Sequence, residues 1–178
     1  MICEYLKRFC EKREKIKIVK ATVETDRALS GTFTPDYSEA FKIAINEVGV
    51  KEYSGENHNP KIIEYHKACE LKARSDEISW CSAFVNWCFL KSQDDSRARS
   101  AAAISWAKWG EEINDPKIGD IVVFRRVGSS WRGHVGFYVG QDDKRILVLG
   151  GNQGNSVSFQ WYPKRGKSLY LFQFRSSR

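Results

Sequence analysis

The spacing of apolar residues changes along the chain, and this change constrains the fold more than any other feature. Between residues 37 and 109 the apolar side chains recur at helical spacing. Later they gather in short β-branched or aromatic runs, which begin at Asp120, His134, Ile146, Ser156 and Leu169. Helices followed by strands are typical of an α+β fold. We therefore predict N-terminal helices packed on a C-terminal antiparallel β-sheet of about five or six strands.

A cysteine stands at the predicted start of the most apolar helix. From Trp80 onward the apolar residues crowd one side of a helical wheel, which leaves Cys81 in the first turn. Backbone N–H groups and the helix dipole favour a thiolate there. Cys88 lies two turns deeper, and we assign it to the core. The alternative for Cys81 is a small buried hydrophobe beside Trp80 and Phe84.

A nucleophilic cysteine needs a base, and the base needs a third polar group that fixes its tautomer. His134 begins a predicted strand between small neighbours, and we predict that it is the base. Asn152 lies at about the distance needed to finish that strand, turn and return, so it is the predicted third member. Gln153 and Asn155 are the other candidates for this role. An ordinary turn between strands is the alternative interpretation of this segment.

Four segments carry a resemblance in the same order along the chain. They are residues 80–88 (WCSAFVNWC), 116–124 (PKIGDIVVF), 133–140 (GHVGFYVG) and 150–153 (GGNQ). Together they resemble the NlpC/P60 superfamily of papain-like cell-wall peptidases, close to its CHAP amidase branch, from about Tyr37 to Phe174. The resemblance implies a papain-like fold and a Cys/His/polar triad that hydrolyses amide bonds in peptidoglycan. This triad maps onto Cys81, His134 and Asn152. CHAP-like members often carry Glu two residues before that Asn, where this chain has Gly150.

The mechanism that we expect is acyl transfer. The Cys81 thiolate attacks the scissile carbonyl, the His134 imidazolium protonates the leaving amine, and Asn152 orients the imidazole ring. The Cys81 backbone N–H is the expected oxyanion donor, and water then hydrolyses the thioester. The predicted substrate-binding residues are Trp80, Asp76, Trp131 and Gln153. Core packing is the alternative for the two tryptophans.

Residues 1–36 lie outside the resemblance. Ile2, Leu6 and Phe9 recur at helical spacing among many charges, which predicts a short amphipathic helix. Turn-forming residues at 30–36 predict a linker, so we divide the chain into an N-terminal extension, 1–36, and a catalytic domain, 37–178. The extension is expected either to dock on the domain or to attach to a membrane or wall through its basic face.

Charge and cysteine spacing restrict the partners. The chain has 29 Lys and Arg against 22 Asp and Glu, and this excess suits an anionic partner such as an acidic cell wall. No basic stripe is interleaved with exposed aromatic residues, so no nucleic-acid partner is expected. The cysteines at positions 3, 10, 69, 81 and 88 lack the spacing of zinc or redox sites. We expect no metal and no cofactor.

No apolar signal-peptide region follows Met1, and no run reaches transmembrane length. We therefore expect a protein that is synthesised in the cytoplasm without a signal peptide and acts on the cell wall in the periplasm or outside the cell. We also expect a monomer. Delivery would be that of a phage endolysin released through a holin, or of a bacteriolytic toxin delivered by a secretion system with an immunity partner. The scissile bond is either the N-acetylmuramoyl-L-alanine amide or a stem-peptide bond. The alternatives in other classes are a catalytically silent wall-binding module and a basic nucleic-acid-binding protein.

Overall fold

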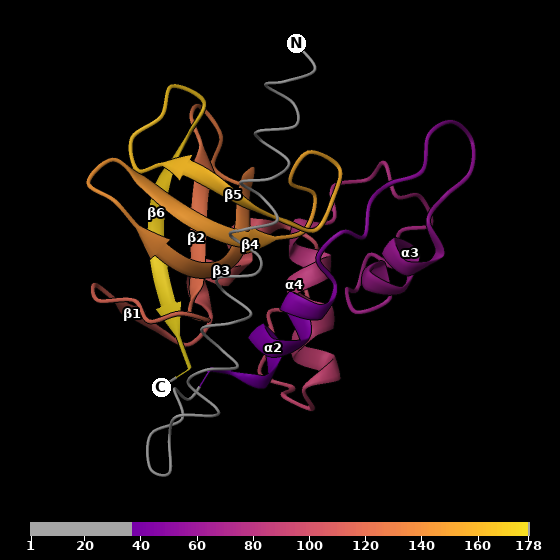
Figure 1. Cartoon of the computed structure of the whole chain (residues 1–178), viewed down its shortest axis with the longest axis horizontal. Helices are drawn as coiled ribbons and strands as arrows, with labels where there is room; N and C mark the ends of the chain where they lie inside the picture. The colour runs from indigo at the N-terminus through magenta and orange to yellow at the C-terminus, as the bar shows by residue number, and fades with distance from the viewer. Residues whose placement is uncertain (1–36, 178) are drawn as a thin grey trace, which may run out of the picture. The chain divides into compact units, whose positions relative to one another are not determined.

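The computed structural model describes residues 37–177, so the predicted N-terminal extension lies outside the described residues. Helices come first: α2 (Glu39–Asn46), α3 (Pro60–His66), α4 (Cys81–Lys91) and the 3₁₀ helix η1 (Ala103–Lys108). Six strands follow: β1 (Glu111–Ile113), β2 (Ile121–Arg126), β3 (Gly133–Gln141), β4 (Arg145–Gly150), β5 (Ser158–Pro163) and β6 (Leu169–Ser176). This order confirms the predicted α+β class (Figure 1).

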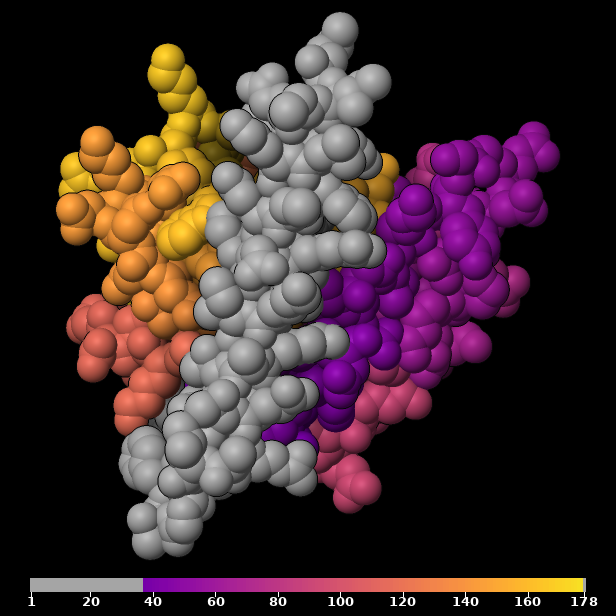
Figure 2. Space-filling view, viewed as in Figure 1, coloured from indigo at the N-terminus to yellow at the C-terminus, as the bar shows by residue number. Residues whose placement is uncertain are grey.

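The six strands form one antiparallel sheet in the order β1-β6-β2-β3-β4-β5. Strands β2 and β3 pair at its centre, where Phe124 lies opposite His134. In the space-filling view the helical residues, indigo to magenta, gather on one side of the strands, which are orange to yellow (Figure 2). The catalytic candidates therefore lie where the helical layer meets the central strands.

Helix α4 is buried on all sides, with continuous burial from Cys81 to Phe89. It contacts α2 and α3 on one side and β3 on the other. The predicted one-sided apolar wheel is therefore wrong, because a helix between two layers buries polar positions as well. Asn86 shows how this is tolerated, since its amide nitrogen donates to the Ser82 carbonyl at 2.9 Å. Cys88 is fully buried, as predicted for a core cysteine.

The ends of the shorter helices follow from local chemistry. The Ser38 hydroxyl accepts a hydrogen bond from the Phe41 backbone N–H and caps α2. Asn59 caps α3, and Pro60 occupies its first position, where a missing N–H costs nothing. Tyr65 of α3 then packs against aromatic side chains on the cysteine helix, with ring centroids 5.0–5.3 Å from Trp87 and Phe84. Burying each such ring contributes on the order of 1.5–3 kcal/mol, so this cluster holds α4 in place.

None of the described helices is long and apolar enough to cross a bilayer.

Candidate active site

Cys81 is the first residue of α4, and its side chain is buried. No side chain caps this helix, in contrast to α2 and α3. The intrahelical hydrogen bonds begin with the Phe84 N–H, which donates to the Trp80 carbonyl at 2.9 Å. An uncapped helix start concentrates backbone N–H donors and positive potential next to the thiol. This is the environment that stabilises a thiolate, and later an oxyanion.

Two opposing effects act on the pKa of Cys81. Burial alone would raise the pKa of this thiol above its ordinary value. A hydrogen bond and positive charge from His134 outweigh that effect, together with hydrogen bonds from the Val135 backbone and the Ser79 side chain. The result is a lowered pKa. In the two other described cysteines nothing comparable opposes burial, which raises the pKa of Cys69 to about 12 and that of Cys88 well above its ordinary value.

The orientation of His134 is fixed by Gln153. The Gln153 amide nitrogen faces two backbone carbonyls, donating to Ser158 O and to Val148 O, so its oxygen must point the other way. That oxygen, Oε1, lies 3.0 Å from His134 Nε2. An amide oxygen can only accept, so Nε2 carries a proton. The other ring nitrogen, Nδ1, is then the one available to Cys81.

Gly150 makes room for this contact. A Cβ atom at position 150 would lie 3.1 Å from Gln153 Oε1 and 3.4 Å from His134 Nε2. The absence of a side chain therefore lets the longer Gln153 side chain reach the histidine from three residues further along. Gly150, which stands where CHAP-like members often carry Glu, and the contact of Gln153 with His134 therefore depend on each other.

The structure places Asn152 differently from the predicted third member of the triad. Among the described residues the hydrogen bond to His134 Nε2 comes from Gln153, and Asn152 instead lines the cavity in front of Cys81. The reason is the backbone of the turn, because Asn152 has a φ of 57° and its neighbour Gln153 turns inward and is buried. Asn155 also has a left-handed φ and is exposed. In this structure the side chain that contacts His134 Nε2 is therefore Gln153 rather than Asn152.

A cavity of about 370 Å³ opens in front of the cysteine. Its lining comprises Ser79, Cys81, Arg126, Gly133, His134, Asn152, Tyr162, Pro163, Ser168 and Leu169. The Tyr162 ring stacks on His134, with centroids 4.9 Å apart, and holds the imidazole from the side. The sequence did not predict Tyr162 or Arg126 as site residues, because both lie in segments with the composition of ordinary strands.

Two predicted substrate-binding residues have structural roles instead. Trp80 is fully buried, and its indole N–H donates to Glu52 at 2.7 Å, so it cannot stack on a substrate. Asp76 is also fully buried, and it accepts hydrogen bonds from the backbone N–H groups of Asn59 and Tyr53. Asp76 thereby fixes the segment that precedes the cysteine helix. Both residues act on the site only through the fold.

The other two predicted substrate-binding residues are not among the residues that line the cavity. Trp131 is 61% exposed in the turn between β2 and β3, with the Arg132 guanidinium 4.7 Å from its ring centroid. Its neighbour Gly133 lines the cavity, so binding by Trp131 stays a prediction. Gln153 is buried behind His134 and reaches the histidine rather than a ligand.

Cysteines 69, 81 and 88 are free thiols. Within residues 37–177 no three His, Cys, Asp or Glu side chains lie close enough together to hold a metal ion.

The comparison with family models agrees with the resemblance seen in the sequence. Residues 73–152 match the family model of the CHAP domain. This segment includes Cys81, His134 and Asn152, and it ends one residue before Gln153. The solved structure of NlpC1 from Trichomonas vaginalis is 18% identical, with a TM-score of 0.47, over 82% of this chain and 45% of that chain. The chain thus spans less than half of the length of that protein. No curated protein shows a significant match.

Proposed function

We propose that this chain, whose residues 73–152 match the CHAP domain model, is a cysteine hydrolase that cleaves amide bonds in peptidoglycan. The observation that carries the proposal is the arrangement of three side chains. Cys81 lies at an uncapped helix start with its pKa lowered by His134, and the far nitrogen of that histidine is held by Gln153. Structural cysteines do not need an oriented imidazole, whereas nucleophilic ones do.

The reaction begins with the thiolate of Cys81 and the imidazolium of His134. The sulfur attacks the scissile carbonyl carbon, and the negative charge moves to the carbonyl oxygen. Backbone N–H groups at the start of α4 are placed to stabilise that oxyanion, a contribution worth roughly 10²–10³ in rate for a single donor in comparable sites. No side chain competes for these donors as a cap.

His134 then moves one proton to the leaving amine from Nδ1, because Nε2 stays bonded to Gln153. The C–N bond breaks, and an acyl thioester forms on Cys81. In the second half-reaction His134 Nδ1 accepts a proton from water, the hydroxide attacks the thioester, and the carboxylic acid product leaves with regeneration of the thiolate–imidazolium pair. Gln153 keeps the ring in one tautomer throughout and is a positioning residue.

The scissile bond that we propose is the N-acetylmuramoyl-L-alanine amide or a bond within the stem peptide. The biological roles that fit a basic wall hydrolase are those of a phage endolysin or a bacteriolytic toxin. The net charge of +7 supports an acidic polymer as substrate, since it raises the local concentration of such a polymer at the protein surface.

The test is mass spectrometry of the soluble products released from purified peptidoglycan. Wild-type protein should release stem peptides free of sugar if it cuts the muramoyl amide, or truncated stems on intact sugar strands if it cuts within the peptide. Cys81→Ala should release neither and remain folded. Cys69→Ala is the matched control, because it removes another buried thiol and should leave the release unchanged. Equal release by wild type and Cys81→Ala would refute the proposal, and wall binding without any release would favour a silent binding module.

A further inference from the structure

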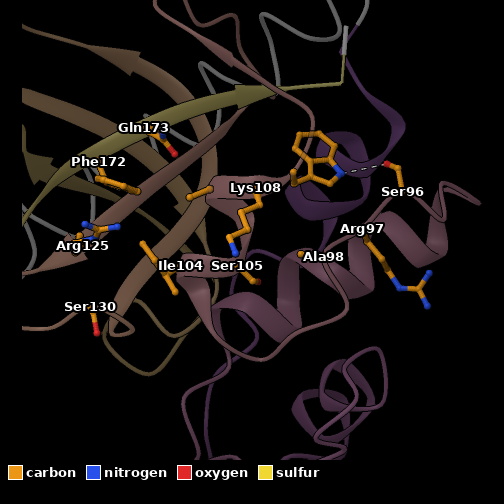
Figure 3. Close-up of a pocket in the computed structure, with 12 residues that line it drawn as sticks. Ser96, Arg97, Ala98, Ile104, Ser105, Lys108, Arg125, Ser130, Phe172 and Gln173 are labelled. Atoms are coloured by element: carbon orange, nitrogen blue, oxygen red, sulfur yellow. Dashed lines mark hydrogen bonds between the residues drawn. The ribbon is translucent and has the colours of Figure 1, made fainter.

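A second cavity, of about 780 Å³, lies between η1 and strands β2 and β6 (Figure 3). Its lining comprises Ser96, Arg97, Ala98, Ile104, Ser105, Ala107, Lys108, Trp109, Arg125, Ser130, Phe172 and Gln173. No residue in this set also lines the cavity at Cys81. The catalytic mechanism therefore leaves this cavity without a role.

Polar atoms without a partner line the cavity. Among the described residues, Arg125 Nε and Gln173 Oε1 are buried and make no hydrogen bond. The Arg125 guanidinium lies over the Phe172 ring, 3.6 Å from its centroid, and this contact fixes its plane. Gln173 donates its amide nitrogen to Glu112 at 2.7 Å, so its oxygen stays available. Leaving such atoms unpaired is costly, and a ligand that pairs them would recover the loss.

The charge of the lining is entirely positive. Arg125 and Lys108 contribute cationic groups, and no Asp or Glu belongs to the lining. The third cationic residue, Arg97, does not face the cavity. Its side chain points away from it and pairs with Asp95 (Figure 3). A ligand must therefore carry an anionic group for Arg125 and Lys108. It must also supply an N–H or O–H donor for Gln173 Oε1.

A peptide with a free carboxylate meets both requirements. Its carboxylate suits a guanidinium and an ammonium group, and its amide N–H suits the Gln173 oxygen. A phosphodiester carries the charge but no donor. Ile104 and Phe172 add apolar surface for the aliphatic part of such a peptide.

The cavity and the catalytic site share one strand and one turn. Arg125 and Arg126 are consecutive in β2, and because strand side chains alternate, they line the two cavities on opposite faces. Ser130, in the turn between β2 and β3, lines the second cavity, and Gly133, the first residue of β3, lines the cavity at Cys81. The exposed Trp131 lies between them along the chain. The β2–β3 pair thus borders both cavities, one on each face of the sheet.

We infer that the cavity is a binding site for a peptide carboxylate and holds a stem peptide of the wall polymer while a bond is cut at Cys81. The identity of that peptide rests on the proposed function. The carboxylate lies against Arg125 and Lys108, and a peptide N–H donates to Gln173 Oε1. The site increases the affinity for polymeric wall over isolated bonds and takes no part in the chemistry.

The experiment uses the full chain carrying Cys81→Ala, which excludes turnover. The probe is the synthetic peptide L-Ala-γ-D-Glu-L-Lys-D-Ala, and the comparison peptide has both carboxyl groups as carboxamides. NMR titration gives the dissociation constants. Arg125→Gln and Lys108→Gln, each in the Cys81→Ala background, should weaken binding of the peptide with free carboxylates by roughly tenfold, because each removes a charge-assisted hydrogen bond. Amidation of the peptide should weaken binding to the parent by a similar factor.

The matched control is Lys144→Gln, which removes an exposed positive charge in the β3–β4 turn that lines neither cavity. Its affinity should equal that of the parent. Equal affinity of the two cavity variants and this control, or indifference to amidation, overturns the inference. Hydrolysis of wall by the wild type is measured separately. If the cavity variants bind the peptide as tightly as the parent while the wild type hydrolyses wall, only the second binding site is refuted. If the wild type does not hydrolyse wall while the cavity variants still weaken peptide binding, only the catalytic proposal is refuted.

Discussion

Gln153 Oε1 lies 3.0 Å from His134 Nε2, while the amide nitrogen of the same side chain is held by two backbone carbonyls. This relationship determines which nitrogen of the histidine faces the cysteine. Because the glutamine amide cannot flip without breaking two hydrogen bonds, the imidazole tautomer is set by the backbone of β4 and β5. The site is therefore preorganised before any substrate arrives.

Replacing Gln153 by Leu should lower the rate of wall hydrolysis by roughly 10–100-fold, the size of effect seen when the partner that orients a metal-binding histidine is removed. The rate should fall because the ring loses its fixed orientation. Asn152→Gly is the comparison, because glycine accepts the φ of 57° at that position. It should retain activity within a few fold. A greater loss for Asn152→Gly than for Gln153→Leu would restore Asn152 as the orienting residue. Thermal denaturation of each variant separates this effect from unfolding.

Gly150→Ala should reduce hydrolysis while leaving the sheet intact. The added methyl group would lie 3.1 Å from Gln153 Oε1, so the glutamine or the histidine must shift. Gly140→Ala is the matched control, because a Cβ at that strand position meets nothing within 4 Å. Turbidity assays on wall suspensions compare the rates. Similar rates for the two variants would show that the site tolerates displacement of the His134–Gln153 pair.

The Cys81 thiol should alkylate with iodoacetamide at a pH below the ordinary thiol range, because its pKa is lowered and the thiolate is the reactive form. Labelling of the Cys81 peptide, followed by mass spectrometry across pH, gives the midpoint. In His134→Ala the midpoint should move to higher pH, since the favourable hydrogen bond and charge are lost while burial remains. Cys69 in the same samples should stay unlabelled through this range, as burial raises its pKa to about 12. An unchanged midpoint would mean that His134 does not stabilise the thiolate.

Asp76→Ala should reduce the free energy of unfolding by roughly 2–4 kcal/mol, because it leaves backbone N–H groups of Tyr53 and Asn59 without a partner. Urea denaturation measures the change, with the exposed Asp143→Ala as control. Burial alone would raise the pKa of Asp76, but these donors and His58 lower it. The folded-state pKa is therefore depressed below the unfolded value of about 3.9. The stabilisation should be fully present above that pH and be lost as the pH falls through the folded-state pKa.

Much of the fold could be predicted from the chain because apolar periodicity records burial. The change from helical spacing to strand runs predicted that the sheet lies in the second half of the chain. Strands β2, β3, β4 and β6 coincide with predicted runs, whereas β5 begins two residues later than its run and extends to Pro163. Strand β1 was missed because Glu111 and Glu112 are charged, and an exposed edge strand of three residues has no apolar pattern. Helix α4 was predicted as amphipathic because a wheel drawn from one chain cannot show that two layers enclose it.

Part of the candidate site could be predicted from the sequence and part could not. The spacing of helix start and strand start singled out Cys81 and His134, and the structure brings them together. The residue behind the histidine depends on one left-handed turn, which decides whether Asn152 or Gln153 points inward. That is a backbone property that a sequence of polar residues does not reveal. Gly150 was the available signal, since a missing side chain leaves space that a longer neighbour can fill.

The group behind His134 is an amide rather than a carboxylate, and an amide has no proton to gain or lose. The thiolate and the imidazolium therefore form a pair with zero net charge, and no Asp or Glu of residues 37–177 lines the cavity beside it. On the acidic side the activity profile should follow the titration of this pair alone, with a slope of one proton. A centre with a carboxylate in that position would show a second ionisation below it.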